Sequence, residues 1–285
     1  MITVLKPLAD KRGKIHNVGD KVSEKLFTER QLIRAKKSGL LGSPVKKLPL
    51  APFKGNIKIA IITGVWKRPE VFKMFADGID RIGKVKGVDV VTIISGSEGQ
   101  RSKKMVTNRC FEYIEVPNKP LARKMNVTAS KARDMKCTHV LCVGSDDIIS
   151  PKLFKEYIKQ IRKGYDFIGV LDFYFYDTVS KKAMYWGGYR ESFRRGHTCG
   201  AGRVISARLL KEWNWKPWNN KDSLYLDNSM QSKLQNTGCN SYTFSLKEKG
   251  LYGLDIKSST NMTPFKKWDN TKFIDAEIIK REFKI

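Results

Sequence analysis

The sequence predicts an α/β fold in which a mostly parallel sheet is covered by helices on both faces. From residue 56 onward, apolar runs of strand length alternate with segments of helical periodicity. These runs are continuously apolar, as expected for strands that are buried on both faces. One run, His139–Val143, is followed directly by Gly144-Ser145-Asp146-Asp147. This places carboxylates at the end of a strand, where ligands bind in open α/β sheets.

The elements of this main domain follow one another along the chain. A buried strand at 57–66 precedes a helix at 69–83, which has Pro69 in its first turn and one apolar face. The other predicted elements are strands at 88–96, 111–117, 139–144 and 165–177, and helices at 119–136 and 151–163. Beyond about residue 172 the segments become rich in aromatic residues and are interrupted by glycines. We expect most of these aromatic side chains in the core, and at least one of Trp213, Trp215 and Trp218 facing a sugar or a base.

Residues 1–45 are predicted to form a small N-terminal α+β module. It has short strands and a helix with Thr28 as its N-cap and Gly39 at its end. A linker at 46–55 lies in a stretch that holds three prolines and two glycines. The main domain then occupies 56–285.

Composition excludes several classes of protein. The 285 residues are 41% hydrophobic and include 6 Trp and 14 Phe, which fits a packed globule. No apolar run reaches the length of a membrane span and no signal peptide opens the chain, so we expect a cytoplasmic protein without a membrane partner. The 5 cysteines are scattered and form no CxxC pair, which indicates reduced thiols and no structural zinc site.

The net charge of the chain is strongly positive. Lys and Arg total 55 against 28 acidic residues, which gives a net charge of +27. This excess runs along the whole chain and produces a long-range attractive field for polyanions. Nucleic acid is the first candidate partner, and an anionic membrane surface or an acidic glycan is the second. A basic surface selected only for solubility is the alternative, which the size of the excess disfavours.

The adjacent acids Asp146 and Asp147 need a compensating group, because two neighbouring carboxylates repel each other. A hard divalent cation that also bridges phosphates meets this need. The alternative is a simple strand-to-helix junction, in which Asp147 or Ser150 caps the helix that begins at Pro151. That alternative explains Ser150 and Pro151 well, but it does not explain two acids directly after a buried strand.

Five motifs occur in order along the main domain: Thr63–Pro69, Asn118–Asn126, Ser145–Asp147, Cys199–Ser206 and Tyr225–Met230. In this order and spacing they resemble motifs of the nucleotide-sugar-dependent glycosyltransferases of the GT-A fold, most of all family-2-type enzymes of bacteriophages. The first two are similar to the loop and the helix start that bind the donor nucleotide. The third is similar to the metal-binding DXD, the fourth to the glycine-rich acceptor-side strand, and the last to the acidic base, usually written ED. The resemblance covers residues 56 to about 262.

Two departures from the family pattern stand out. Ser145 replaces the first acid of DXD, so that one carboxylate contact is lost or is replaced by a hydroxyl. Asp227-Asn228 replaces Glu-Asp, which leaves Asp227 as the only carboxylate of that pair.

The resemblance implies a GT-A type, Rossmann-like fold and a metal-dependent, inverting hexosyl- or pentosyltransferase that uses a nucleoside-diphosphate sugar, with a UDP-sugar as the first candidate. It implies that Asp147 and Asp146 bind Mn²⁺ or Mg²⁺ and that Asp227 is the catalytic base. An N-cap of the following helix is the alternative role for Asp227. The residues expected to contact the donor are Thr63, Gly64, Arg68, Lys124, Asn126, Asp146 and Lys257, the last of which closes the site together with Asp255.

The acceptor is inferred from the charge and from the N-terminal module. Val18-Gly19-Asp20 lies in a stretch that resembles small modules at the start of phage proteins. Together with the charge of +27, this indicates a phage enzyme, active in the host cytoplasm, that glycosylates hydroxymethylated bases of double-stranded DNA. One alternative is the same chemistry on a cell-surface glycan or a protein, which the missing membrane anchor disfavours. Another is a non-enzymatic nucleic-acid-binding protein, which the paired acids disfavour because they repel phosphates unless a cation is bound.

Overall fold

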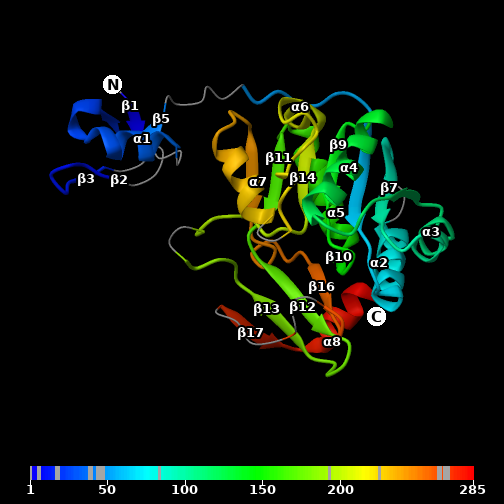
Figure 1. Cartoon of the computed structure of the whole chain (residues 1–285). Helices are drawn as coiled ribbons and strands as arrows, with labels where there is room; N and C mark the ends of the chain where they lie inside the picture. The colour runs from blue at the N-terminus through cyan, green and yellow to red at the C-terminus, as the bar shows by residue number, and fades with distance from the viewer. Residues whose placement is uncertain are drawn as a thin grey trace. The chain divides into compact units, whose positions relative to one another are not determined.

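The computed structural model describes residues 2–4, 8–16, 20–37, 41–42, 49–82, 85–191, 194–223, 226–261, 265 and 270–285. Contacts within the chain divide it into two compact units, one of residues 1–48 with 234–238 and one of residues 49–233 with 239–285. Figure 1 follows the chain from the N-terminal unit into the larger one.

The smaller unit has α+β structure. Strands β4, β1 and β5 form one sheet, strands β2 and β3 form a two-stranded ribbon, and a helix follows. The bounds are β1 Ile2–Val4, β2 Leu8–Ala9, β3 Ile15–His16, β4 Lys21–Val22, η1 Glu24–Leu26, α1 Glu29–Lys37 and β5 Leu41–Gly42. Thr28 caps α1, because its Oγ1 accepts the N–H of Gln31 at 3.2 Å while Gln31 Oε1 accepts the N–H of Thr28 at 2.9 Å. The predicted N-cap is confirmed, and the predicted helix end at Gly39 lies outside the described residues.

The larger unit contains a mixed, mostly parallel sheet of seven strands in the order β15-β11-β14-β9-β6-β7-β8. Among these described strands, β14 alone runs antiparallel to its neighbours, β11 and β9. The strands are β6 Ile57–Gly64, β7 Val88–Gly96, β8 Glu112–Glu115, β9 His139–Cys142, β11 Phe167–Val170, β14 Arg203–Ser206 and β15 Ser241–Phe244. The predicted α/β fold is therefore confirmed.

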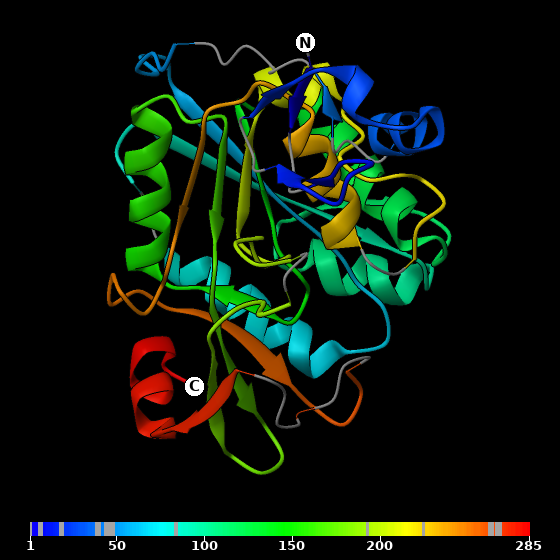
Figure 2. The same ribbon diagram turned by 90° about the vertical axis from the view of Figure 1, so that its left-hand side faces the viewer.

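A second sheet of five strands has the order β10-β16-β12-β13-β17. Figures 1 and 2 show it, with helix α8, at one end of the seven-stranded sheet. Its strands are β10 Asp147–Ile149, β12 Phe173–Asp177, β13 Ala183–Trp186, β16 Gly253–Lys257 and β17 Thr271–Ile274.

Helices cover the seven-stranded sheet. They are α2 Pro69–Ile82, α3 Gln100–Thr107, α4 Leu121–Asp134, α5 Pro151–Arg162, α6 Ala207–Glu212 and α7 Leu226–Gln235, whereas α8 Ala276–Phe283 contacts β13 of the second sheet. Connections between parallel strands are right-handed, so α2 and α4 lie on opposite faces, since α4 returns across the sheet from β8 to β9. Ser150 Oγ caps α5 by accepting the N–H of Leu153 at 3.2 Å, as expected. No helix in the described part of the chain is long and apolar enough to cross a membrane.

The predicted elements between residues 57 and 163 are confirmed, with ends that shift by no more than two residues. The single strand predicted at 165–177 is wrong, because the chain leaves the first sheet at Leu171-Asp172 and enters the second as β12. The buried carboxylate of Asp172 fixes this crossing by accepting the N–H of Leu246 and the hydroxyl of Tyr185. The expectation that one of three tryptophans faces a ligand is also wrong, because Trp213, Trp215 and Trp218 are all buried.

The strand order reverses next to β6. Strand β7 follows β6 on one side, whereas β9, which comes later in the chain, pairs with β6 in parallel on the other side. In an open α/β sheet the ligand crevice lies at the carboxyl ends of the strands at such a reversal. Here those ends are Gly64 on β6 and Cys142 on β9.

Candidate active site at the strand ends

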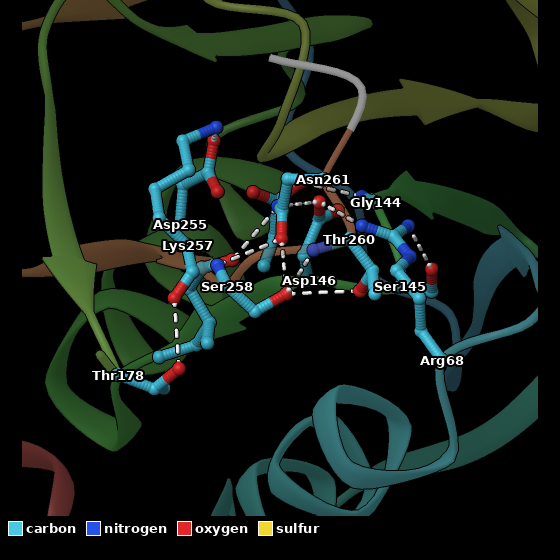
Figure 3. A network of polar contacts seen from close by, with 12 residues as sticks. Arg68, Gly144, Ser145, Asp146, Thr178, Asp255, Lys257, Ser258, Thr260 and Asn261 are labelled. Atoms are coloured by element: carbon cyan, nitrogen blue, oxygen red, sulfur yellow. Dashed lines mark hydrogen bonds and ion pairs between the residues drawn. The ribbon is translucent and has the colours of Figure 1, made fainter. Parts of the chain in front are cut away.

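Arg68 joins the loop after β6 to the loop after β9. Its Nη1 donates to Asp146 Oδ2 at 2.7 Å and its Nη2 donates to Ser145 Oγ at 2.9 Å (Figure 3). Helix α2 begins at Pro69, directly after Arg68, so the backbone of Arg68 lies at the start of this helix. The serine that replaces the first acid of the DXD pattern thus accepts a hydrogen bond from the same guanidinium that pairs with the neighbouring carboxylate.

Asn261 also holds Asp146, from the C-terminal part of the chain. Its Nδ2 donates to Asp146 Oδ2 at 2.8 Å, and its Oδ1 accepts the N–H of Ser258 at 2.9 Å (Figure 3). A backbone hydrogen bond also joins these two parts of the chain, because the N–H of Ile256 donates to the carbonyl of Asp146 at 2.7 Å. Asp146 is therefore fixed from both ends of the larger unit.

Asp147 and Asp255 face each other across two strands. In the antiparallel pair β10 and β16 they are directly opposed. Burial, together with the charges of Asp255 and Asp146, raises the pKa of Asp147 well above its usual range. Burial and the charge of Asp146 raise the pKa of Asp255 to about 7, although Lys257 Nζ donates to Asp255 Oδ2 at 2.6 Å.

Gly144 allows these carboxylates to gather. A Cβ at this position would lie 2.6 Å from Asp146 Oδ1 and 2.7 Å from Asp147 Oδ2. The backbone N–H of Gly144 also donates to Asp147 Oδ2. A side chain at Gly144 would displace the carboxylates of Asp146 and Asp147, so the glycine allows their present positions.

The hydrogen bonds and ion pairs of the three carboxylates are incomplete. When all three are ionised, Asp146, Asp147 and Asp255 carry one negative charge more than Arg68 and Lys257 balance, which agrees with the raised pKa of Asp147 and of Asp255. Oδ1 of Asp255 is buried and accepts no hydrogen bond within the described part of the chain. No group of three His, Cys, Asp or Glu in that part is arranged to hold a metal ion unaided. A divalent cation here would complete its oxygen shell with oxygens of a ligand.

Lys124 lies at the carboxyl ends of β6 and β7 and is 1% exposed. Its Nζ donates to the Val65 carbonyl at 2.7 Å, to Ser97 Oγ at 3.1 Å and to Asn118 Oδ1 at 3.2 Å. Burial lowers its pKa to about 8, against the opposite effect of nearby acids. These acceptors hold the ammonium in place, and the donor contact expected for Lys124 stays a prediction.

Thr63 and Gly64 end β6 beside Lys124. The Oγ1 of Thr63 is buried without a hydrogen-bond partner among the described residues. A Cβ at Gly64 would lie 3.3 Å from Ser95 Oγ and 3.4 Å from Lys124 Cδ. The donor-binding roles expected for these residues stay predictions.

Asn126 lies away from the acids. Its Nδ2 donates to the Trp218 carbonyl at 2.8 Å and to Asn220 Oδ1 at 2.7 Å, and its Oδ1 accepts the N–H of Trp218 at 3.2 Å. These bonds fasten the 218–220 segment to α4. The donor contact expected for Asn126 gains no support from this geometry.

Asp227 lies in the first turn of α7, and its side chain is 34% exposed. Tyr189 donates its hydroxyl to Asp227 Oδ2 at 3.0 Å. Arg203 Nη1 lies 3.8 Å from Oδ1. A Cβ at Gly200 would lie 2.3 Å from Oδ1, so the backbone of the glycine-rich loop rests directly against this carboxylate.

The surroundings of Asp227 and the acid cluster share one edge of the sheet. Gly202 donates its N–H to the Cys142 carbonyl at 2.8 Å, which joins the glycine-rich loop to the end of β9. Arg203 stands opposite Cys142 in the pairing of β14 with β9. The fully buried Tyr157 lies near both the glycine-rich loop and the acid cluster, because a Cβ at Gly202 would lie 2.6 Å from its hydroxyl oxygen and the nearby Asp147 adds to the effect of burial in raising its pKa. The candidate base therefore lies on the same side of the sheet as the acids.

Comparison with solved structures identifies proteins that resemble this chain. A structure of residues 1–349 of S. aureus TarS, a glycosyltransferase, has a TM-score of 0.52 at 13% identity over 70% of this chain and 60% of that one. The fold is GT-A-like. An inositol-1-phosphate CTP transferase from T. maritima covers 74% of this chain and 94% of its own, at 13% identity and a TM-score of 0.43. No protein-family model and no curated protein sequence matches the chain.

Sequence reasoning alone missed several residues of this region. Asn261, Tyr189 and Arg194 were not singled out, and Arg203 was named only as part of the glycine-rich motif; their contacts depend on long-range folding. Asp255 was predicted together with Lys257, with which it alternates along an apolar strand and so shares a face.

Proposed function

We propose that this chain is a metal-dependent glycosyltransferase. It takes a sugar from a nucleoside-diphosphate sugar, with a UDP-sugar as the first candidate, and transfers it to a hydroxyl group with inversion. The observation that carries this proposal is the cluster of Asp146, Asp147 and Asp255 at the point where the strand order of a GT-A-like sheet reverses. That cluster holds one negative charge more than its cationic partners balance.

The donor end of the site is assigned to the acid cluster. Asp147 and Asp146 would hold Mn²⁺ or Mg²⁺ together with oxygens of the donor, and Asp255 would close the site beside Lys257. The bound cation would neutralise the charge that develops on the leaving diphosphate. Arg68 orients Asp146 through its 2.7 Å ion pair, and Lys257 orients Asp255 through a 2.6 Å bond.

The acceptor end is assigned to Asp227. Its carboxylate takes the proton of the acceptor hydroxyl, whose oxygen forms a bond to the anomeric carbon. The bond from that carbon to the diphosphate oxygen breaks, and the nucleoside diphosphate leaves. Attack from the face opposite the leaving group inverts the anomeric carbon. The 34% exposure of the Asp227 side chain supports access for an acceptor.

We propose hydroxymethylated bases in double-stranded DNA as the acceptor. The net charge of +27 supports this acceptor, because a chain with this charge attracts DNA of any base sequence. A cell-surface glycan or a protein stays the alternative acceptor. A non-enzymatic nucleic-acid-binding protein is the third possibility, and the surplus negative charge of the acid cluster speaks against it.

Residues 1–45 are proposed as an accessory module that adds to polyanion binding, and 56–285 as the transferase.

One experiment tests the reaction. The purified chain is incubated with Mn²⁺, a panel of nucleotide sugars, and either hydroxymethylated or plain duplex DNA, and the DNA is digested to nucleosides for mass spectrometry. The expected product is a glycosylated hydroxymethyl nucleoside that is absent with plain DNA and with Asp147→Asn. Sugar transfer to a glycan or a protein, with none to DNA, would replace the acceptor and keep the chemistry. Release of no sugar from any donor would remove the transferase proposal.

A further inference from the structure

A second guanidinium lies over the candidate base. The side chain of Arg194 stacks on Tyr189 with its Cζ 3.5 Å from the ring centroid, and its Nη2 lies 3.9 Å from Asp227 Oδ2. The latter distance is too long for a hydrogen bond. Trp186 packs edge-on against Tyr189, with 4.8 Å between the two ring centroids. The guanidinium is thus held in place by stacking on an aromatic ring.

The charge of Asp227 is already balanced without Arg194. Arg203 is 1% exposed and lies 3.8 Å from Asp227 Oδ1. It is fixed there, because its Nε donates to Thr198 Oγ1 at 3.0 Å and its Nη2 to the Thr198 carbonyl at 2.8 Å. A buried arginine needs a counter-charge, and Asp227 supplies it. Arg194 therefore adds a positive charge beyond what this carboxylate neutralises.

Arg194 also has unused hydrogen-bonding capacity. Its Nε is buried and has no hydrogen-bond partner among the described residues. Its side chain is 18% exposed, so it is not fully enclosed by the protein. An arginine presents a planar fork of donors that matches the oxygens of a phosphate.

The segment that carries Arg194 is basic throughout. Residues 187–197 contain three arginines and one acid, Glu191. Arg190 and Arg195 are exposed, and neither pairs with an acid in the part of the chain that the structure describes. The surroundings of Asp227 therefore favour an anionic group next to the hydroxyl that this carboxylate would deprotonate.

We infer that Arg194, supported by Tyr189, binds a phosphodiester group of the acceptor polymer beside Asp227. The inference rests on the proposed transferase function and narrows its acceptor to a phosphodiester-linked chain. The donor diphosphate is assigned elsewhere, since Arg68 and Lys257 serve the acid cluster whereas Arg194 and Tyr189 come from the segment that contacts α7. The contact would hold the polymer so that its hydroxyl meets the carboxylate.

Two measurements on the full chain test this inference. The first is a titration of ¹⁵N-arginine-labelled protein with dimethyl phosphate, which is the smallest phosphodiester, followed by NMR of the Nε–H groups. The second is the affinity of a fluorescent DNA duplex and of UDP for wild type and Arg194→Gln. Arg133→Gln is the matched control, because Arg133 is an exposed arginine of α4 that pairs only with its neighbour Asp134 in the described structure.

We expect a saturable shift of one Nε–H signal that is missing in Arg194→Gln. Loss of one charged contact should weaken duplex binding roughly tenfold and lower the salt dependence by about one counterion, with UDP affinity unchanged. Arg133→Gln should change duplex affinity less than twofold. No shift of the Arg194 signal with dimethyl phosphate would overturn the inference. Weakened UDP binding with unchanged duplex binding would instead assign Arg194 to the donor. A phosphodiester site in a chain that transfers no sugar would reject the proposed function alone.

Discussion

Asp147 and Asp255 are directly opposed on the antiparallel strands β10 and β16, so two carboxylates occupy one cross-strand pair. The flanking pair Ile148 and Leu254 is buried and fixes this register, because a slip by one residue would turn both side chains to the other face. Like charges in such a pair are destabilising. The fold therefore accepts a cost here that a proton or a cation relieves.

The first prediction concerns the cation. Mn²⁺ at about 100 times its Kd should raise the melting temperature of the wild type by roughly 5 °C, because binding to the folded state alone stabilises it. Asp147→Asn and Asp255→Asn remove one charge of the pair, so both should lose most of this rise. Differential scanning fluorimetry with Mn²⁺ and with excess chelator measures it. The exposed Asp89, changed to Asn, serves as the control and should respond like the wild type. An equal rise in all four proteins would place the cation elsewhere.

The second prediction concerns the buried Lys124. Its pKa of about 8 in the folded chain lies below the usual value of about 10.4 in an unfolded chain. Between these values the unfolded chain binds more protons, so stability rises with pH. Urea unfolding of wild type and Lys124→Met at several pH values should show the wild type gaining relative to the variant from pH 8 to 10. A difference that does not change with pH would mean that the three acceptors around Nζ fully offset burial.

The sequence predicted those parts of the site that depend on local pattern. The position of Asp146 and Asp147 at a strand end followed from an apolar run and the residues after it. The contact of Asn261 with Asp146 joins residues 115 positions apart, and no periodicity reports such a contact. For the tryptophans, the local pattern gave a wrong prediction. Asn214 and Trp215 have φ of 51° and 55°, so the polar residues of that segment form a turn while Trp213, Trp215 and Trp218 pack inward.

The third prediction concerns the N-terminal unit. A chain that starts at Pro49 should keep UDP affinity and lose part of its affinity for duplex DNA, because it lacks basic residues such as Lys11, Arg12 and Lys14. The truncated chain must still include Phe53, because the N–H of Phe53 donates to the Arg162 carbonyl at 3.0 Å and its ring packs edge-on against His139. Fluorescence anisotropy at several salt concentrations measures the change. A loss of UDP binding on truncation would show that the unit belongs to the transferase.

The fourth prediction concerns Gly200. A methyl group here would lie 2.3 Å from Asp227 Oδ1, so Gly200→Ala must displace the carboxylate. Turnover should fall at least tenfold, since a small misplacement of a reacting group is costly, while UDP affinity stays unchanged. Gly55→Ala is the control, because its new methyl group would meet only the Phe53 ring, at 3.2 Å. Full turnover in Gly200→Ala would argue against a precise role for Asp227.

The last prediction concerns Asp227 itself. Asparagine keeps the shape and still accepts the Tyr189 hydroxyl, but it removes the basic group. If Asp227 is the base, turnover should fall by roughly a hundredfold or more while donor affinity stays near that of the wild type.

A purely structural role gives a different pattern. The carboxylate balances the buried Arg203, so its loss should also lower stability, and turnover must be measured where the variant is fully folded. Tyr189→Phe is the matched control, because it removes the 3.0 Å hydrogen bond to Oδ2 and leaves the carboxylate in place. It should lower turnover less than tenfold. If the folded Asp227→Asn protein turns over near the wild-type rate, Asp227 serves only as the counter-charge of Arg203, and the base lies elsewhere.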